Sequence, residues 1–165
     1  MPDLNFTRKD AAPSILAGFF FLLQMIYGFF YADNTTIILI EYFGVGVFIL
    51  SGVFGMLPVI VFQRKGGVEK GKSYIHTTKI VDTGIYSIVR HPQYSAFILW
   101  AIGAMLLFQN WIVIILGFPV ILLTYFDMTR EDKRLIQKFG KSYEEYVKKV
   151  PRANFLLGIF RVILK

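Results

Sequence analysis

Residues 95–126 read SAFILWAIGAMLLFQNWIVIILGFPVILLTYF and decide the fold. Two apolar runs, 95–108 and 111–126, are separated only by Gln109 and Asn110, and neither run contains a charged residue. As helices they would measure roughly 21 and 24 Å, at about 1.5 Å per residue, whereas the hydrocarbon of a bilayer is about 30 Å thick. This stretch therefore predicts a short helical hairpin inserted in a membrane.

Two longer apolar segments precede the hairpin, at residues 14–31 and 37–62. The first lacks a small-residue cleavage site followed by a polar mature chain, so we interpret it as a span and not as a signal peptide. The second has small residues that let another helix approach closely; they are Gly44, Gly46, Ser51, Gly52 and Gly55. We expect this face to serve either for close helix packing or for lateral access of a lipid chain to a site beside the hairpin.

The C-terminal region has a different pattern. Residues 129–149 are strongly charged, but six apolar or aromatic positions share one helical face; they are Leu135, Ile136, Phe139, Tyr143, Tyr146 and Val147. Gly140 interrupts this face, which predicts an amphipathic cap of two short helices. Residues 155–164 are too short to span a bilayer and are expected in the membrane interface or against the bundle.

Positive charge is distributed unevenly along the chain. The polar connector 63–93 carries six Lys or Arg residues against Glu69 and Asp82, and the C-terminal region is also basic, whereas the Asp33–Asn34 turn has no basic residue. By the positive-inside rule, the connector and the cap face the cytoplasm and the turn lies outside. We expect a multi-pass membrane protein whose active site faces the cytoplasm and whose partners are lipids, not nucleic acid.

Composition supports this interpretation. Of 165 residues, 55% are hydrophobic and 18% are charged, whereas about a quarter of residues are charged in soluble domains. The predicted fold is an all-α integral membrane protein of four to five helices: two long N-terminal spans, a short hairpin and an amphipathic cytoplasmic cap. We expect one membrane-embedded domain over residues 1–165, with an N-terminal helical hairpin (1–62) and a cofactor-binding and catalytic region (63–165).

Several kinds of chemistry are excluded by the residues present. The chain has no Cys, which rules out disulfides, thiolate metal sites and a cysteine nucleophile. It has no phosphate-binding glycine-rich loop and no serine nucleophile elbow. His76 and His91 are too few for a zinc site without other evident ligands, so no metal is expected.

The remaining candidate is residues 84–94, GIYSIVRHPQY, at the cytoplasmic mouth of the hairpin. This segment places a cation, an imidazole and two phenols within nine positions. Pro92 is suited to begin the next helix, whose first-turn amides are available to an anion.

Several motifs together resemble one family. They are Gly84-x-Tyr86, Arg90-His91-Pro92-x-Tyr94, the pair Glu131-Asp132, Phe139-Gly140-x-x-Tyr143-x-x-Tyr146 and Val150-Pro151-Arg152. Their order and spacing over residues 80–160 resemble the isoprenylcysteine carboxyl methyltransferases, of which this chain looks like a compact member. The resemblance implies a membrane enzyme that transfers a methyl group from S-adenosylmethionine to a lipidic acceptor, such as the carboxylate of a prenylcysteine-like substrate.

The resemblance also suggests roles for individual residues. We expect His91 and Tyr94 to bind the amino-acid end of the cofactor and Glu131 to bind its ribose hydroxyls or ammonium. Tyr86, Ile88 and Leu99 are expected either to line the adenine or to pack in the core.

Two cations are the candidate catalytic residues. Arg90 and Arg130 are expected either to orient the acceptor carboxylate or to contact lipid head groups. The family commonly has a longer run of Glu preceded by Arg-rich positions, where this chain has Phe126-Asp127-Met128-Thr129-Arg130-Glu131-Asp132. The choice of arginine and the acceptor therefore stay open.

Other functions are also compatible with the sequence. More distant similarity points to a phospholipid N-methyltransferase or to an NADPH-dependent membrane sterol or enone reductase. A small membrane scaffold without enzymatic activity is a further alternative, for which the polar motifs would be head-group anchors. The reductase must bind a second phosphate-bearing ribose, and the scaffold would show no saturable binding of S-adenosylmethionine.

Overall fold

The protein is described by a computed structural model that covers residues 8–32, 36–67 and 78–164. Within these residues there are six α-helices, one short 3₁₀ helix and no strand. The elements are α1 (Arg8–Tyr31), α2 (Ile38–Lys65), η2 (Gly84–Ser87), α3 (Pro92–Phe108), α4 (Trp111–Phe139), α5 (Lys141–Lys149) and α6 (Phe155–Ile163). The predicted Asp33–Asn34 turn, Glu69, Lys70, Lys72 and His76 lie outside the described residues.

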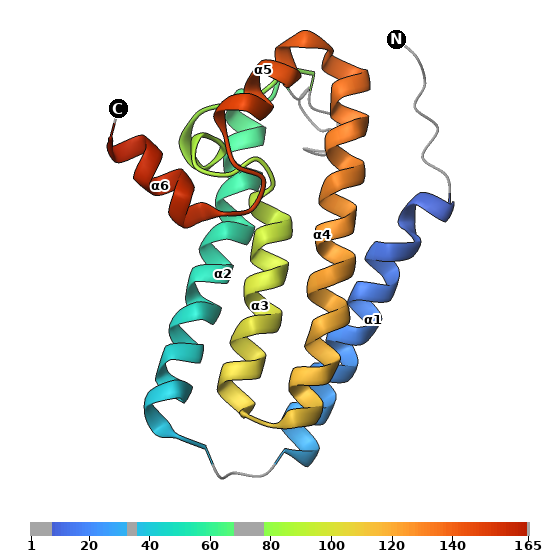
Figure 1. Cartoon of the computed structure of the whole chain (residues 1–165), viewed down its shortest axis with the longest axis vertical. Coiled ribbons are helices and arrows are strands. Elements are labelled where there is room, and N and C mark those ends of the chain that lie inside the picture. Colours follow the sequence, from blue (N-terminus) through green and yellow to red (C-terminus); the bar gives the residue numbers. More distant parts are fainter. Residues whose placement is uncertain (1–7, 33–35, 68–77, 165) are drawn as a thin grey trace.

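Four long helices run side by side in the order α2, α3, α4, α1 (Figure 1). The second helix packs mainly against α3, and the first mainly against α4. The segment 1–62 was predicted as an N-terminal helical hairpin, but its two helices pack on partners from the second half of the chain instead of chiefly on each other. Gln24 of α1 reinforces this arrangement, because its buried Nε2 donates to the carbonyl oxygens of Ala101 and Val113, both at 3.1 Å.

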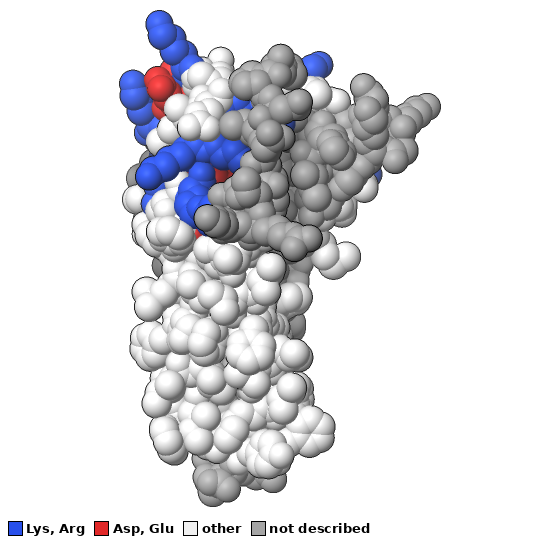
Figure 2. Space-filling view, turned by 90° about the vertical axis from the view of Figure 1, so that its right-hand side faces the viewer, with Lys and Arg blue, Asp and Glu red and all other residues white. Residues whose placement is uncertain are grey.

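The predicted all-α membrane fold is confirmed. Three helices are long and apolar enough to cross a membrane: Ala11–Tyr31, Ile38–Lys65 and Trp111–Phe139. The remaining long helix, Pro92–Phe108, is apolar but shorter. On the face shown in Figure 2, the Lys and Arg side chains gather at one end of the molecule, above an uncharged surface that matches a lipid-facing belt.

The hairpin is less symmetric than the sequence predicted. Gln109 ends α3 with a left-handed backbone (φ 45°), and Asn110 caps α4 by accepting a hydrogen bond from the Ile112 amide at 2.9 Å. The second arm was expected to end near residue 126, but it continues to Phe139, because the charged residues that follow remain compatible with a helix. The predicted mismatch with bilayer thickness therefore applies only to the 17-residue α3, about 26 Å long.

The cap is built from separate short helices. Gly140 has a positive φ of 58° and lies between α4 and α5, which confirms the predicted break. Asn154 then caps α6 by accepting a hydrogen bond from the Leu157 amide at 3.0 Å. These additional helices raise the number of described α-helices to six, above the four to five predicted.

Part of the small-residue face of α2 serves for close helix packing. Ser51 Oγ donates to the carbonyl oxygen of Ala96 at 2.8 Å, and a Cβ at Gly44 would lie 2.9 Å from the backbone nitrogen of Leu107. A Cβ at Gly55 would contact Ala96, whereas a Cβ at Gly46 or Gly52 would have no atom within 4 Å. Close packing is therefore confirmed for three of the five positions, and lateral access of a lipid chain stays a prediction.

Candidate functional site

Asp132 of α4 is the centre of a buried polar cluster. Its Oδ1 accepts hydrogen bonds from Arg90 Nη1 at 3.2 Å, Tyr143 OH at 2.9 Å and, in the tautomer that carries a proton there, His91 Nε2 at 2.8 Å. Its Oδ2 accepts from Arg152 Nε at 2.7 Å. One carboxylate thus joins α4 to the segment before α3, to α5 and to the linker before α6.

Backbone contacts hold the same segments together. The amide of Arg90 donates to the carbonyl oxygen of Pro151 at 3.0 Å, and the amide of His91 donates to that of Arg152 at 3.3 Å. Tyr146 OH donates to the carbonyl oxygen of Tyr86 at 2.6 Å. The Arg-His-Pro motif and the Val-Pro-Arg motif, about 60 residues apart, therefore lie against each other.

Electrostatics fix the protonation of the groups in the cap that contact Asp132. Burial raises the pKa of the Tyr143 phenol well above its ordinary value, and the charge of Asp132 raises it further, so Tyr143 remains a donor. Partial burial opposes the charged form of Arg152, but the hydrogen bond and charge of Asp132 outweigh this and raise the pKa of its guanidinium. The carboxylate is therefore held by at least two permanent cations, Arg90 and Arg152.

A second group of predicted residues lies on the neighbouring flank of α3 and α4. The ring of Tyr94 meets that of His91 edge-on, with centroids 5.8 Å apart. Glu131 accepts from Arg134 Nε at 2.8 Å and from Arg134 Nη2 at 2.5 Å. Arg130, whose side chain is 30% exposed, has its Nη1 at 3.9 Å from Asp127 Oδ1.

The two candidate catalytic arginines thus differ in their surroundings. Arg90 is buried and directs Nη1 at Asp132, which favours a positioning role over direct contact with an acceptor. Arg130 is the more accessible of the two, and contact of either arginine with an acceptor carboxylate stays a prediction.

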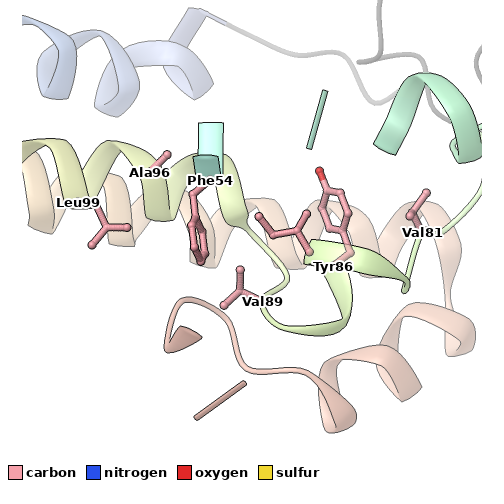
Figure 3. Packing of buried hydrophobic residues seen from close by; sticks show 7 residues of the cluster. Phe54, Val81, Tyr86, Val89, Ala96 and Leu99 are labelled. Carbon is pink, nitrogen blue, oxygen red and sulfur yellow. The ribbon is translucent and has the colours of Figure 1, made fainter. Parts of the chain in front are cut away.

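The three residues expected to line an adenine lie together in an apolar cluster. Tyr86 and Leu99 are buried with Phe54 of α2 (Figure 3), and Ile88 packs against this cluster. The ring of Tyr86 also contacts that of Phe62, with centroids 4.6 Å apart. This environment explains all three as packing residues, and their contact with an adenine stays a prediction.

A cavity of about 300 Å³ opens between α1, α3 and α4, next to the Tyr94 flank. Its lining comprises Ser14, Ala17, Gln93, Tyr94, Phe97, Thr124 and Asp127. Asp127 is buried and accepts a hydrogen bond from Ser14 Oγ. Thr124 Oγ1 is buried without a hydrogen-bond partner among the described residues. The wall of the cavity therefore contains a hydroxyl group whose hydrogen bonds are not satisfied by these residues.

Sequence reasoning assigned Glu131 to the site and gave no role to Asp132, which makes the contact with His91. It also missed Asp127 and Thr124. A signal for Asp127 was present, because an ionisable residue adjoining an apolar membrane helix is costly and is usually functional.

Metal chemistry has no support in the described ranges, since no group of three His, Asp or Glu side chains there has the arrangement to hold a metal ion. The donor set fits S-adenosylmethionine better. The carboxylate of Glu131, whose side chain is 22% exposed, suits its ammonium or ribose hydroxyls, and Tyr94, next to His91, provides an aromatic ring.

Comparison with known proteins places this arrangement in context. The sequence model of the isoprenylcysteine carboxyl methyltransferase (ICMT) family matches residues 70–137, the stretch that contains His91, Tyr94, Glu131 and Asp132. No solved structure gives a significant match.

Curated relatives agree with this match. The protein-S-isoprenylcysteine O-methyltransferase of Schizosaccharomyces pombe is 38% identical over 112 residues, which cover 61% of this chain and 47% of the relative. Protein-S-isoprenylcysteine O-methyltransferase B of Arabidopsis thaliana is 32% identical over 111 residues, which cover 59% of this chain and 56% of the relative. The protein-S-isoprenylcysteine O-methyltransferase of Saccharomyces cerevisiae is 36% identical over 113 residues, which cover 61% of this chain and 47% of the relative.

The resemblance predicted from the motifs is therefore confirmed. The matched region of this chain spans about half the length of the curated relatives.

Proposed function

We propose that this chain is a membrane methyltransferase that transfers a methyl group from S-adenosylmethionine to a lipidic acceptor. The carboxylate of a prenylcysteine-like molecule is the acceptor that the names of the relatives suggest. One observation carries the proposal: His91 contacts both Tyr94 and Asp132, which lies some 40 residues later beside Glu131, and all four residues fall within the region that matches the family.

The residues that would hold the cofactor are His91, Tyr94 and Glu131. When bound, S-adenosylmethionine would supply an electrophilic methyl group on a sulfonium sulfur. Because an acceptor carboxylate is already an anion, no general base is required, and positioning and desolvation provide the rate enhancement. This agrees with a site in which the most tightly bonded acid, Asp132, is engaged with four protein groups.

Several side chains of this chain would share the task of positioning the cofactor and the acceptor. Asp132 bonds His91 and Arg90, which precede α3, and also bonds Tyr143 and Arg152 of the cap. This shared carboxylate holds the start of α3 close to the cap. Arg130 is placed to attract and orient an acceptor carboxylate at the membrane surface. Burial of Arg90, His91 and Asp132 excludes water from this side of the site.

The test is equilibrium binding of S-adenosylmethionine to the full chain in lipid nanodiscs, with transfer of labelled methyl groups to N-acetyl-S-farnesylcysteine as a second readout. We expect saturable binding, and we expect His91→Ala and Glu131→Gln each to weaken it more than tenfold, or about 1.4 kcal/mol. Glu144→Gln, on the exposed face of α5, is the matched control and should bind as the wild type does.

Thermal melting of each variant separates lost contacts from lost folding. Variants that melt like the wild type and bind the cofactor with unchanged affinity would refute the assigned roles of His91 and Glu131. Absence of saturable cofactor binding in the folded wild type would instead favour the scaffold, and binding of NADPH would favour the reductase.

A further inference from the structure

Asp127 is a buried carboxylate at the cytoplasmic end of the bundle that the proposed chemistry does not use. Its residue is 6% exposed, and it lines the 300 Å³ cavity between α1, α3 and α4. Tyr94 lines the same cavity and contacts His91, a partner of Asp132, so the cavity adjoins the polar cluster. A buried carboxylate is costly unless cations or hydrogen-bond donors surround it.

Among the described residues, Asp127 is compensated only in part. Ser14 Oγ donates to Oδ2, but the nearest cation in this part of the chain, Arg130 Nη1, is 3.9 Å from Oδ1, close to the limit of an ion pair. One helical turn earlier on α4, Thr124 is 2% exposed, and its Oγ1 has no partner within the described part of the chain. The cavity wall therefore contains a negative group and, beside it, a buried hydroxyl that has no partner among the described residues.

The remaining walls suit an organic cation with an apolar tail. Tyr94 and Phe97 provide aromatic faces, which attract ammonium groups. Further along the helices, Phe21 contacts Phe97 with centroids 5.1 Å apart and stacks on Trp100 at 5.8 Å. Trp100 is 39% exposed, so this row of aromatic rings leads from the cavity along α1 and α3 to the lipid-facing surface.

We propose that Asp127 and Thr124 form an ammonium-binding subsite that takes the α-ammonium group of an amino acid. The identity of the acceptor rests on the proposed function. The relatives are named for protein-S-isoprenylcysteine, whose cysteine nitrogen is held in a peptide bond, whereas this subsite fits an S-alkylated cysteine with a free amino group. Its ammonium would bind Asp127, its carboxylate would face Arg130, and its alkyl chain would follow Phe97 and Trp100.

The amino-acid end of S-adenosylmethionine has the same ammonium chemistry, and the experiment separates the two sources. Equilibrium affinities are measured in nanodiscs for S-farnesylcysteine, N-acetyl-S-farnesylcysteine and S-adenosylhomocysteine. The variants are Asp127→Asn, which preserves shape and an acceptor for Ser14, and Thr124→Val, which removes only the hydroxyl. Glu144→Gln is the control for loss of one carboxylate elsewhere.

We expect the wild type to bind S-farnesylcysteine at least tenfold more tightly than its N-acetyl form. Asp127→Asn should abolish this preference by weakening only the free amine, and Thr124→Val should reduce it severalfold. If S-adenosylhomocysteine alone loses affinity, the subsite stands and its ammonium belongs to the cofactor. Unchanged affinities for all three compounds in either folded variant would overturn the subsite.

Failure of the subsite and failure of the proposed function give different results. If the wild type prefers the free amine but transfers no methyl group, the subsite is supported and the proposed function is refuted. A wild type that methylates both farnesyl compounds equally, with no effect of Asp127→Asn on binding, keeps the function and loses the subsite. If Asp127→Asn does not fold, the Thr124→Val affinities decide between these results.

Discussion

At the scale of single residues, Asp132 is the polar group on which most of the site depends. Four hydrogen bonds reach its two oxygens, from Arg90, His91, Tyr143 and Arg152. The side chains of Arg90, His91 and Asp132 are at most 7% exposed, so little solvent is present to replace a lost partner. Removal of the central charge should therefore cost far more than removal of a surface charge.

We predict that Asp132→Asn lowers the free energy of unfolding by about 3–5 kcal/mol, because it leaves the buried Arg90 without its counter-charge and removes a partner of the partly exposed Arg152. Thermal melting in detergent or nanodiscs measures this loss. Glu144→Gln removes an exposed carboxylate and should melt within about one degree of the wild type, since surface charges contribute little. Equal melting temperatures for the two variants would contradict the central role of Asp132.

The sequence motif indicated that the acidic pair Glu131-Asp132 belongs to the site, but it did not indicate which of the two carboxylates contacts His91. Adjacent residues of an α-helix point about 100° apart, so Glu131 and Asp132 face different neighbours. Which of them meets His91 depends on the rotation of α4 about its axis, and local spacing contains no information about that rotation. For the same reason Asp127 was noticed only as a departure from the family and not as the wall of a cavity.

At the scale of helices, α6 shows how the cap is attached. Phe155 packs its ring on Phe54 of α2, with centroids 5.4 Å apart, and Arg161 Nη2 donates to the carbonyl oxygen of Ser87. Between them, Gly158 is buried against the backbone of Ile88. The helix thus holds the segment that leads into the Arg-His-Pro motif.

A methyl group at Gly158 should disrupt this attachment, because an added Cβ would collide with the carbonyl oxygen of Ile88. Alanine is otherwise the better helix former by about 1 kcal/mol, so any loss reflects packing. We predict that Gly158→Ala destabilises the protein by about 1–3 kcal/mol and weakens binding of S-adenosylmethionine. Thermal melting and equilibrium binding measure the two effects.

Gly18→Ala is the matched control, since an added Cβ there has no atom within 4 Å. It should be neutral or slightly stabilising. A Gly158→Ala variant as stable as the Gly18→Ala variant would show that α6 does not hold the site segment in place.

Helix lengths were predicted well where an apolar run and a helix coincide, as in α2. They were predicted poorly for α4, because hydropathy changes at residue 126 whereas the helix continues to Phe139. Hydropathy depends on the surroundings of a helix, whereas the helix itself ends only at a residue whose backbone favours another conformation. Gly140, with its positive φ, is such a residue, and the sequence did identify it as a break.

At the scale of the whole molecule, the class of fold was predictable but the pairing of helices was not. Both the lipid-facing and the buried surfaces of a membrane helix are apolar, so periodicity does not reveal which face meets which neighbour. The two N-terminal spans thus appeared to form a hairpin, whereas the structure places α3 and α4 between them (Figure 1). Buried polar residues such as Gln24 and Ser51 were the better guide to neighbours.

The orientation in the membrane is the remaining large-scale expectation. The turn at Asn110 lies at one end of the bundle, and α5, with its basic residues, lies at the other (Figure 1). The positive-inside rule assigns the α5 end to the cytoplasm, where a soluble cofactor such as S-adenosylmethionine would reach the site. If this orientation is correct, the two ends must respond oppositely to a reagent that cannot cross the membrane.

Because the chain contains no Cys, single substitutions report each end without a background. We predict that Asn110→Cys reacts with an impermeant maleimide added to intact cells, whereas Ser142→Cys on the exposed face of α5 reacts only after the cells are permeabilised. Labelling of both after permeabilisation controls for reactivity of the thiols. Labelling of Ser142→Cys in intact cells would place the cap outside, and the cytoplasmic site would have to be abandoned.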